Sequence, residues 1–252
     1  MARVESTGWT SIQTGVGLVV AGSLMVAFVV LEGRARQPLV HPHTWKISSL
    51  VSSTTVMLGI TGLLMAVVFL TSIFGQTALG YSALESGLAF LPLAATLVLG
   101  THLAAHSRPH LAARTIAAIG LGVVAGGGLL LSRADATSSY LGGLLTGLCL
   151  VGLGAGLVFA AVAGTAMSGI PAEHTGMASG FLMTGHEVGA ALGVAVLSAI
   201  AGTAGNLTAA SGAVDAYARG SIAITATALV FATLAAAWMP AGQADAAHMH
   251  MH

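Results

Sequence analysis

A glutamate and a histidine, Glu187 and His186, stand side by side in a long apolar stretch near the end of the chain. If the stretch 176–201 crosses a bilayer, Glu187 lies about a dozen residues into the helix, near mid-membrane. An ionised carboxylate there costs at least about 2.5 kcal/mol unless it meets water, a partner or a proton. Burial disfavours the charged form, so Glu187 is a candidate for proton-coupling or substrate-responsive chemistry. A structural carboxylate bonded to a neighbouring helix is the alternative.

His186 precedes Glu187, and on a helix its Cα–Cβ bond points about 100° away from that of Glu187. We therefore expect that the two side chains need not touch. Histidine titrates near neutrality and is also a common interior hydrogen-bonding residue. His186 is predicted either to tune the protonation of Glu187 or to bond to another helix.

Two strips of small residues follow the same predicted helix. The strip within about 60° of Glu187 is small and polar, and we expect it to line an aqueous cavity. It consists of Gly180, Thr184, Ala191 and Ser198. The strip on the roughly opposite side repeats every four residues, and we expect it to let another helix approach closely. It consists of Gly185, Gly189 and Gly193.

Enzyme chemistry finds little support in these residues. The run from His186 to Ala190 begins like a zinc-protease motif, but Ala190 stands where the second histidine ligand is needed. Ser179 and His186 are separated by a rise of about 10 Å on one helix, which is too far for proton transfer. The lysine Lys46 lies in a predicted loop and cannot act as a buried Schiff base. We expect no catalytic residues, no metal site and no enzyme activity.

The composition identifies the class of protein. The chain has 252 residues, of which 56% are hydrophobic and 6% charged, against about a quarter charged in soluble domains. A water-soluble fold is therefore excluded. Equal numbers of acidic and basic residues give a net charge of zero, so nucleic-acid binding is excluded as well. The 34 glycines favour helices that pack closely within a bilayer.

A membrane-spanning helix needs roughly 20 apolar residues, and seven apolar stretches have about this length or more. They predict an all-α polytopic membrane protein. They lie near 11–31, 49–73, 86–104, 115–131, 140–165, 176–201 and 220–239. The charge-free stretch 136–171 is counted as one span, because two helices of about 18 residues would leave nothing for a turn.

The basic residues predict the orientation of the spans by the positive-inside rule. Those expected on the cytoplasmic side are Arg34, Arg36, Lys46, Arg108 and Arg114. Those expected outside are Arg3, Arg133 and Arg219. This arrangement predicts an external N-terminus, and together with an odd number of spans it indicates that the chain is part of a larger unit.

Three motifs resemble one family, and their order and spacing along the chain agree with it. The first, from Gln76 to Pro92, contains Gly80-Tyr81-Ser82, Gly87-Leu88 and Leu91-Pro92. The second runs from Pro171 to Leu197 and the third from Leu31 to Val40. Together they resemble the C-terminal half of fourteen-span drug:proton antiporters of the major facilitator superfamily, over roughly residues 8–240.

The resemblance implies a domain organisation. Residues 1–10 would be an outer segment, 11–48 an extra membrane helix with a cytoplasmic linker, 49–240 the six-helix C-terminal bundle, and 241–252 a disordered tail rich in histidine and methionine. The family's N-terminal bundle has no counterpart in this sequence. A second helix bundle, either an N-terminal half or another copy of the chain, is the expected partner.

The resemblance also implies a function, namely half of a proton-coupled exporter of hydrophobic or cationic small molecules that works by alternating access in the inner (plasma) membrane. Glu187 and His186 would be its proton-coupling or substrate-responsive residues. The expected partners are the lipid bilayer, the small-molecule substrate and the second bundle, with no cofactor besides the coupling proton. The alternative is a non-transporting membrane module, either a truncated remnant or a bundle with a role in assembly.

Overall fold

The computed structural model describes residues 12–34, 47–107, 110–135, 140–168, 170–171, 174–205 and 209–240. The regular secondary structure in these ranges is helical, as the sequence predicts. The predicted outer segment 1–10, the tail 241–252, and the predicted cytoplasmic residues Arg36, Lys46 and Arg108 lie outside the described residues.

The chain divides into two compact units, Met1–Thr44 and Trp45–His252. The described part of the first unit is the helix α1 (Ile12–Arg34), which covers the first predicted apolar stretch. Its 23 residues give a length of about 35 Å, enough to cross a hydrocarbon core of about 30 Å. That α1 crosses the membrane stays a prediction.

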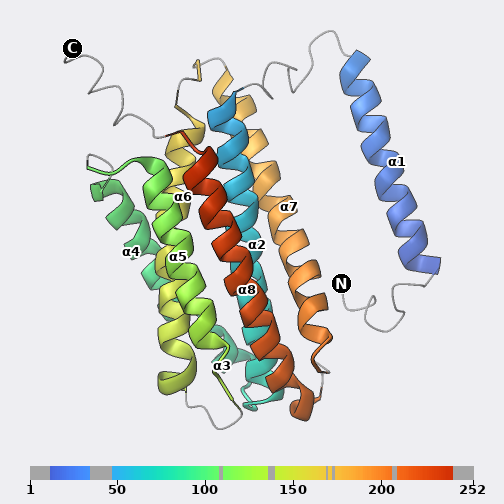
Figure 1. Ribbon diagram of the computed structural model, residues 1–252. Helices are drawn as coiled ribbons and strands as arrows, with labels where there is room; N and C mark the ends of the chain where they lie inside the picture. Colours follow the sequence, from blue (N-terminus) through green and yellow to red (C-terminus); the bar gives the residue numbers. More distant parts are fainter. Residues whose placement is uncertain are drawn as a thin grey trace. The chain divides into compact units, whose positions relative to one another are not determined.

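The second unit is a bundle of membrane-length helices (Figure 1). Its elements are α2 (Ser48–Thr77), α3 (Ala83–Leu88), α4 (Leu91–Ser107), α5 (Ala113–Leu131), a π-helical turn (Tyr140–Leu144), α6 (Leu145–Ala166), α7 (Thr175–Gly202) and α8 (Ala210–Trp238). Among the described residues, six helical segments are long and apolar enough to cross a membrane, with α3–α4 and the π turn with α6 each counted as one. The stretch 136–171 holds a single span, as predicted.

The third predicted span is interrupted near its N-terminal end, which its sequence does not predict. Helix α3 ends at Leu88 and α4 begins at Leu91. Pro92 has no N–H to donate to the preceding turn, which favours a break at this point. A capping box starts α3, because the hydroxyl oxygen of Ser82 accepts from the N–H of Glu85 at 3.2 Å and the Glu85 carboxylate accepts from the N–H of Ser82 at 2.8 Å.

The last helix, α8, starts at Ala210, ten residues before the predicted boundary at 220. The predicted span begins after Asp215 and Arg219, because charged residues limit an apolar stretch, but they do not stop a helix. Both side chains are exposed. Arg219 donates to the Thr203 hydroxyl at 3.3 Å and so ties the start of α8 to the end of α7.

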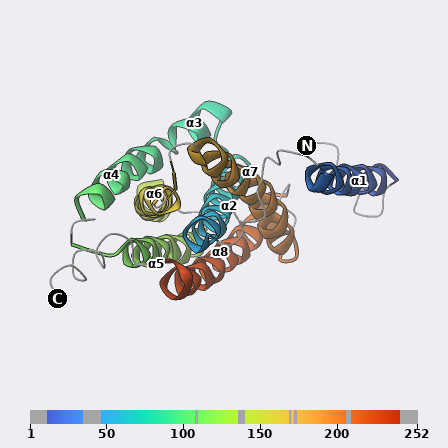
Figure 2. The ribbon, with the colours of Figure 1, turned by 90° about the horizontal axis from the view of Figure 1, so that it is seen from above.

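Helices α2 and α6 organise the bundle. Helix α2 packs against α6, α7 and α8, whereas α6 packs against α4 and α5, and α5 in turn against α8. Seen from above in Figure 2, α5 and α8 run along one side of the bundle, and α4 and α7 lie near opposite edges. Helices α4 and α7 are the least buried of the six spans.

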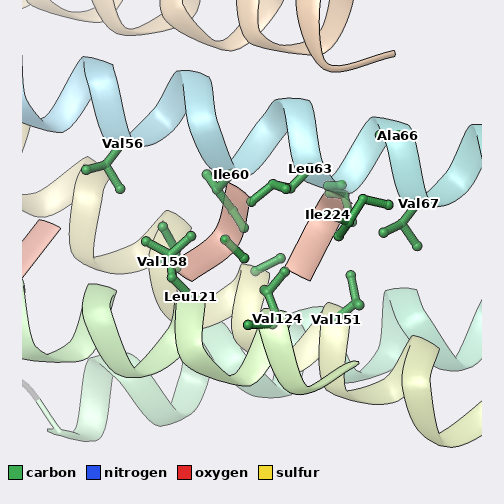
Figure 3. Packing of buried hydrophobic residues seen from close by; sticks show 14 of the residues in the cluster. Val56, Ile60, Leu63, Ala66, Val67, Leu121, Val124, Val151, Val158 and Ile224 are labelled. Carbon is green, nitrogen blue, oxygen red and sulfur yellow. The ribbon is translucent and has the colours of Figure 1, made fainter. Parts of the chain in front are cut away.

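The centre of the bundle is filled by branched aliphatic side chains from four helices (Figure 3). They include Val56, Ile60 and Leu63 of α2, Leu121 and Val124 of α5, Val151 and Val158 of α6, and Ile224 of α8. Lipid tails are as apolar as these side chains, so close packing rather than exclusion of water holds such helices together in a bilayer. A Cβ on Gly120 of α5 would lie 2.8 Å from the carbonyl oxygen of Gly154 on α6, which shows how closely the two backbones approach.

Candidate functional site

Glu187 lies on the uncovered face of α7, near the middle of that helix. Helix α7 begins at Thr175, which places Glu187 about 18 Å along its axis. Its side chain is 73% exposed. Large apolar side chains, also exposed, lie along the same helix, namely Met183, Val188, Leu192 and Val196. A carboxylate therefore stands at mid-depth on an uncovered surface that carries no other acidic residue.

This position is unfavourable for contact with lipid tails. A charged side chain at the centre of a bilayer costs at least about 2.5 kcal/mol, and intramembrane carboxylates almost always face a bundle interior or a water-filled cavity. Glu187 lies too far from either end of α7 for its short side chain to reach the headgroups. A carboxylate at this position is therefore more stable beside water or a polar partner than beside lipid tails.

His186 touches Glu187, whereas the sequence analysis expected that the two side chains need not touch. Nδ1 of His186 lies 3.3 Å from Oε1 of Glu187. The angle of about 100° between neighbouring helical positions describes the Cα–Cβ bonds, and two long side chains can bend toward each other beyond Cβ. The His186 side chain is 34% exposed, so the imidazole is more covered than the carboxylate.

Phe159 of α6 lies beside the histidine. The ring centroids of Phe159 and His186 are 6.3 Å apart and the ring planes are tilted by 36°, within the range of interacting aromatic pairs. The Phe159 side chain is half-buried and also packs against the hydrophobic core. Phe159 is not predicted from the sequence, because α6 has no charged residue or histidine that would mark one of its faces as functional.

The predicted cavity strip lies on the Glu187 side of α7. Gly180, Thr184 and Ala191 are exposed, and Ser198 is half-buried. The Thr184 hydroxyl donates to the carbonyl of Gly180 at 2.9 Å, and the Ser198 hydroxyl donates to the carbonyl of Ala195 at 3.3 Å. Both hydroxyls donate their hydrogen to a carbonyl of the same helix, so only their acceptor lone pairs are available to a ligand or to water. That the strip lines a cavity stays a prediction.

The three glycines on the other side of α7 lie against α2. A Cβ on Gly185 would meet the Thr54 side chain, one on Gly189 would meet the backbone of Leu58, and one on Gly193 would meet the backbone of Gly62. Because this side of α7 is held by α2, the side with Glu187 is turned out of the bundle.

Two predicted basic residues of the second unit, Arg114 and Arg133, do not join this site. Arg114 is exposed in the first turn of α5, and Arg34 ends α1. Arg133 is exposed just after α5. Within the described ranges, no group of three or more histidine, cysteine or acidic residues could hold a metal ion. The sidedness that the basic residues predict stays a prediction.

These features define a multi-pass helical membrane protein with an ionisable pair at mid-depth on one uncovered face. The family model described as the Major Facilitator Superfamily matches residues 4–194. The chain therefore belongs to the Major Facilitator Superfamily. This is a family of transporters, not of enzymes.

Several relatives are proteins named for export or drug resistance. The chain is 33% identical to the cephamycin export protein CmcT of Amycolatopsis lactamdurans, over 81% of this chain and 42% of the relative. It is 33% identical to the multidrug resistance protein Stp of Mycobacterium tuberculosis, over 77% of this chain and 36% of the relative. It is 35% identical to the puromycin resistance protein pur8 of Streptomyces alboniger, over 79% of this chain and 40% of the relative. The chain thus spans about two fifths of the length of these relatives.

Proposed function

We propose that this chain forms the C-terminal half of a proton-coupled exporter of hydrophobic or cationic small molecules, of the fourteen-span type, in the plasma membrane. Three relatives named for cephamycin export, multidrug resistance and puromycin resistance support export as the activity. The six membrane-length segments of the described bundle support the half-transporter architecture.

The observation that carries the proposal is the uncovered carboxylate of Glu187 at mid-depth. In transporters of this general design, the substrate and the coupling ion bind near the bilayer midplane between two units that rock around the site. The α7 face with Glu187 supplies one wall of such a site. A second helix bundle supplies the other wall, and it keeps the carboxylate away from lipid.

The proposed mechanism is competition between a proton and the substrate for one acidic site. When Glu187 is ionised, the site carries a negative charge that attracts a cationic substrate. When a proton binds, the charge is lost, the attraction ends and the substrate is released. Alternating exposure of the site to the two sides of the membrane couples this exchange to the proton gradient.

Transport in proteoliposomes tests the proposal. The full chain is reconstituted with and without whatever second bundle copurifies with it, and efflux of ethidium is followed under an imposed proton gradient. Glu187→Gln keeps the size and hydrogen bonding of the residue but cannot titrate, and it should abolish the dependence of efflux on the gradient. Glu85→Gln is the matched control, because Glu85 caps α3 at its start and lies outside the site; its efflux should stay within about twofold of the unmodified chain.

Two results would contradict the proposal. If Glu187→Gln leaves the gradient dependence unchanged, Glu187 is a structural carboxylate. If neither the chain nor its complex moves ethidium, the non-transporting assembly module becomes the better hypothesis. The mass of the purified chain in mild detergent identifies beforehand which complex to reconstitute.

A further inference from the structure

We propose that Phe159 positions His186 so that His186 and Glu187 bind and release one proton as a unit. This inference rests on the proposed function of the α7 face. It adds a residue from α6 that contributes no charge but sets the geometry of the proton-binding pair.

The geometry of the three residues supports a positioning role. The Phe159 ring lies 6.3 Å from the imidazole ring, on a helix other than the one that carries the pair. The imidazole Nδ1 lies 3.3 Å from the carboxylate of Glu187. An aromatic ring beside the imidazole restricts the rotamers open to His186, and so holds Nδ1 within reach of the carboxylate.

No other ionisable group crowds the pair on the described elements packed against α7. Helix α2 carries no acidic, basic, histidine, tyrosine or cysteine residue. On the π turn and α6, Tyr140 and Cys149 lie about 28 Å and about 15 Å along the axis from Phe159.

On α8, the ionisable residues are Asp215, Tyr217 and Arg219. All three belong to its first third, and Arg219 bonds to Thr203, which lies beyond the end of α7 and about 25 Å along the axis from His186. On the described helices that pack against α7, the ionisable side chains therefore lie well away from the pair.

Two side chains in contact can share one proton in a way that one carboxylate cannot. With its hydrogen on Nδ1, the neutral imidazole donates to the ionised Glu187, and the pair carries a charge of −1. A proton that arrives binds at Nε2, the free nitrogen of that tautomer, and the pair becomes an internal ion pair with a net charge of zero. The site thus alternates between a charge that holds an organic cation and a neutral state that releases it.

The test is the pH dependence of cation binding by the full chain in lipid nanodiscs. Tetraphenylphosphonium is the probe, and its binding is measured between about pH 5 and 8.5. The unmodified chain should lose binding on acidification, as the pair takes up a proton. His186→Asn keeps an N–H donor near Glu187 but cannot take that proton, so half of its binding should be lost at a pH about one unit lower.

Phe159→Leu distinguishes positioning from simple packing. It keeps an apolar side chain but removes the ring, so its binding profile should move in the same direction as that of His186→Asn. Phe69→Leu is the matched control, because Phe69 is a half-buried phenylalanine of α2 that packs against the core. The control profile should overlay that of the unmodified chain. A Phe159→Leu profile that keeps the original half-binding pH, even with weaker affinity, would overturn the inference.

A second readout separates this inference from the proposed function. In protein labelled with ¹⁵N-histidine, the His186 signal is identified by its loss in His186→Asn. Its titration should change in Glu187→Gln and in Phe159→Leu, and stay unchanged in Phe69→Leu. A chain that binds no tetraphenylphosphonium at any pH would contradict the proposed function, while the His186 signal would still decide whether the pair titrates as a unit.

Discussion

Gly62 and Gly193 meet backbone to backbone where α2 crosses α7. A Cβ on Gly193 would overlap the Cα and the carbonyl oxygen of Gly62, and a Cβ on Gly62 would lie 2.8 Å from the carbonyl oxygen of Gly189. Such an approach is open only to residues without a side chain. The contact sets the rotation of α7 about its own axis, because the glycine side must face α2. It thereby decides that Glu187, on the other side, faces outward.

Gly193→Ala is expected to destabilise the bundle. Its new methyl group would overlap backbone atoms that cannot move without separating α2 from α7, so the free energy of unfolding should fall by about 1–3 kcal/mol. Gly180→Ala is the control on the same helix, since a Cβ there would meet nothing within 4 Å. Its effect should stay below about 1 kcal/mol. Unfolding in mixed detergent micelles measures both, and equal effects would contradict the assigned crossing.

A buried hydroxyl pair links α2 to α8. The hydroxyl oxygens of Thr71 and Tyr217 are 3.0 Å apart, and the Tyr217 ring stacks on Phe74 with centroids 4.3 Å apart. Tyr217→Phe keeps the stacking but leaves the Thr71 hydroxyl without this partner, at an expected cost of about 1 kcal/mol. Thr71→Val in the same background should add less than it does alone. Strict additivity in the double-mutant cycle would show that the two hydroxyls are not coupled.

The Tyr140 hydroxyl ties the π turn before α6 to the break between α3 and α4. It donates to the carbonyl of Ala89 at 2.7 Å. Tyr140→Phe should remove about 0.5–1.5 kcal/mol of stability and speed amide hydrogen exchange around Phe90. Exchange in the middle of α2 serves as the internal reference. If exchange around Phe90 stays at its original rate, the bond does not hold the break in place.

Cysteine labelling should distinguish the two exposed surfaces of the bundle. In a Cys149→Ala background, Ala191→Cys on the Glu187 side of α7 is expected to react with a charged, membrane-impermeant thiol reagent. Leu229→Cys on α8 is the control, because Leu229 is an exposed apolar side chain on a helix whose exposed face we expect to meet lipid. Its rate should be at least about tenfold slower, since thiolate formation and reagent access both need water. Equal rates would contradict an aqueous face on α7.

The sequence alone determined the class of fold and most of its elements. The shortage of charge and the long apolar stretches predicted membrane helices. Charged side chains are so costly in hydrocarbon that a helix crossing a bilayer must be long and mostly apolar. The single span in 136–171 follows from bilayer thickness alone and is present. The motif around Gly80-Tyr81-Ser82 pointed to the superfamily to which the chain belongs.

The two boundaries that the sequence does not predict have different causes. The break at Ala89 and Phe90 lies beside Pro92 and accepts a hydrogen bond from Tyr140, which is distant in sequence. The apolar content of the segment predicts neither feature. The early start of α8 was missed because charge marks the edge of the apolar core and not the end of a helix.

Only the tertiary structure decided the environment of the candidate site. The position of Glu187 at mid-depth could be read from the sequence, because depth depends on spacing along one helix. The contact of Glu187 with His186 depends on rotamers, and the neighbour of His186, Phe159, comes from another helix, which has no charged residue or histidine in its sequence. Spacing within a segment specifies which residues share a face, whereas contacts between segments arise only when packing fixes the rotation and depth of each helix against its neighbours.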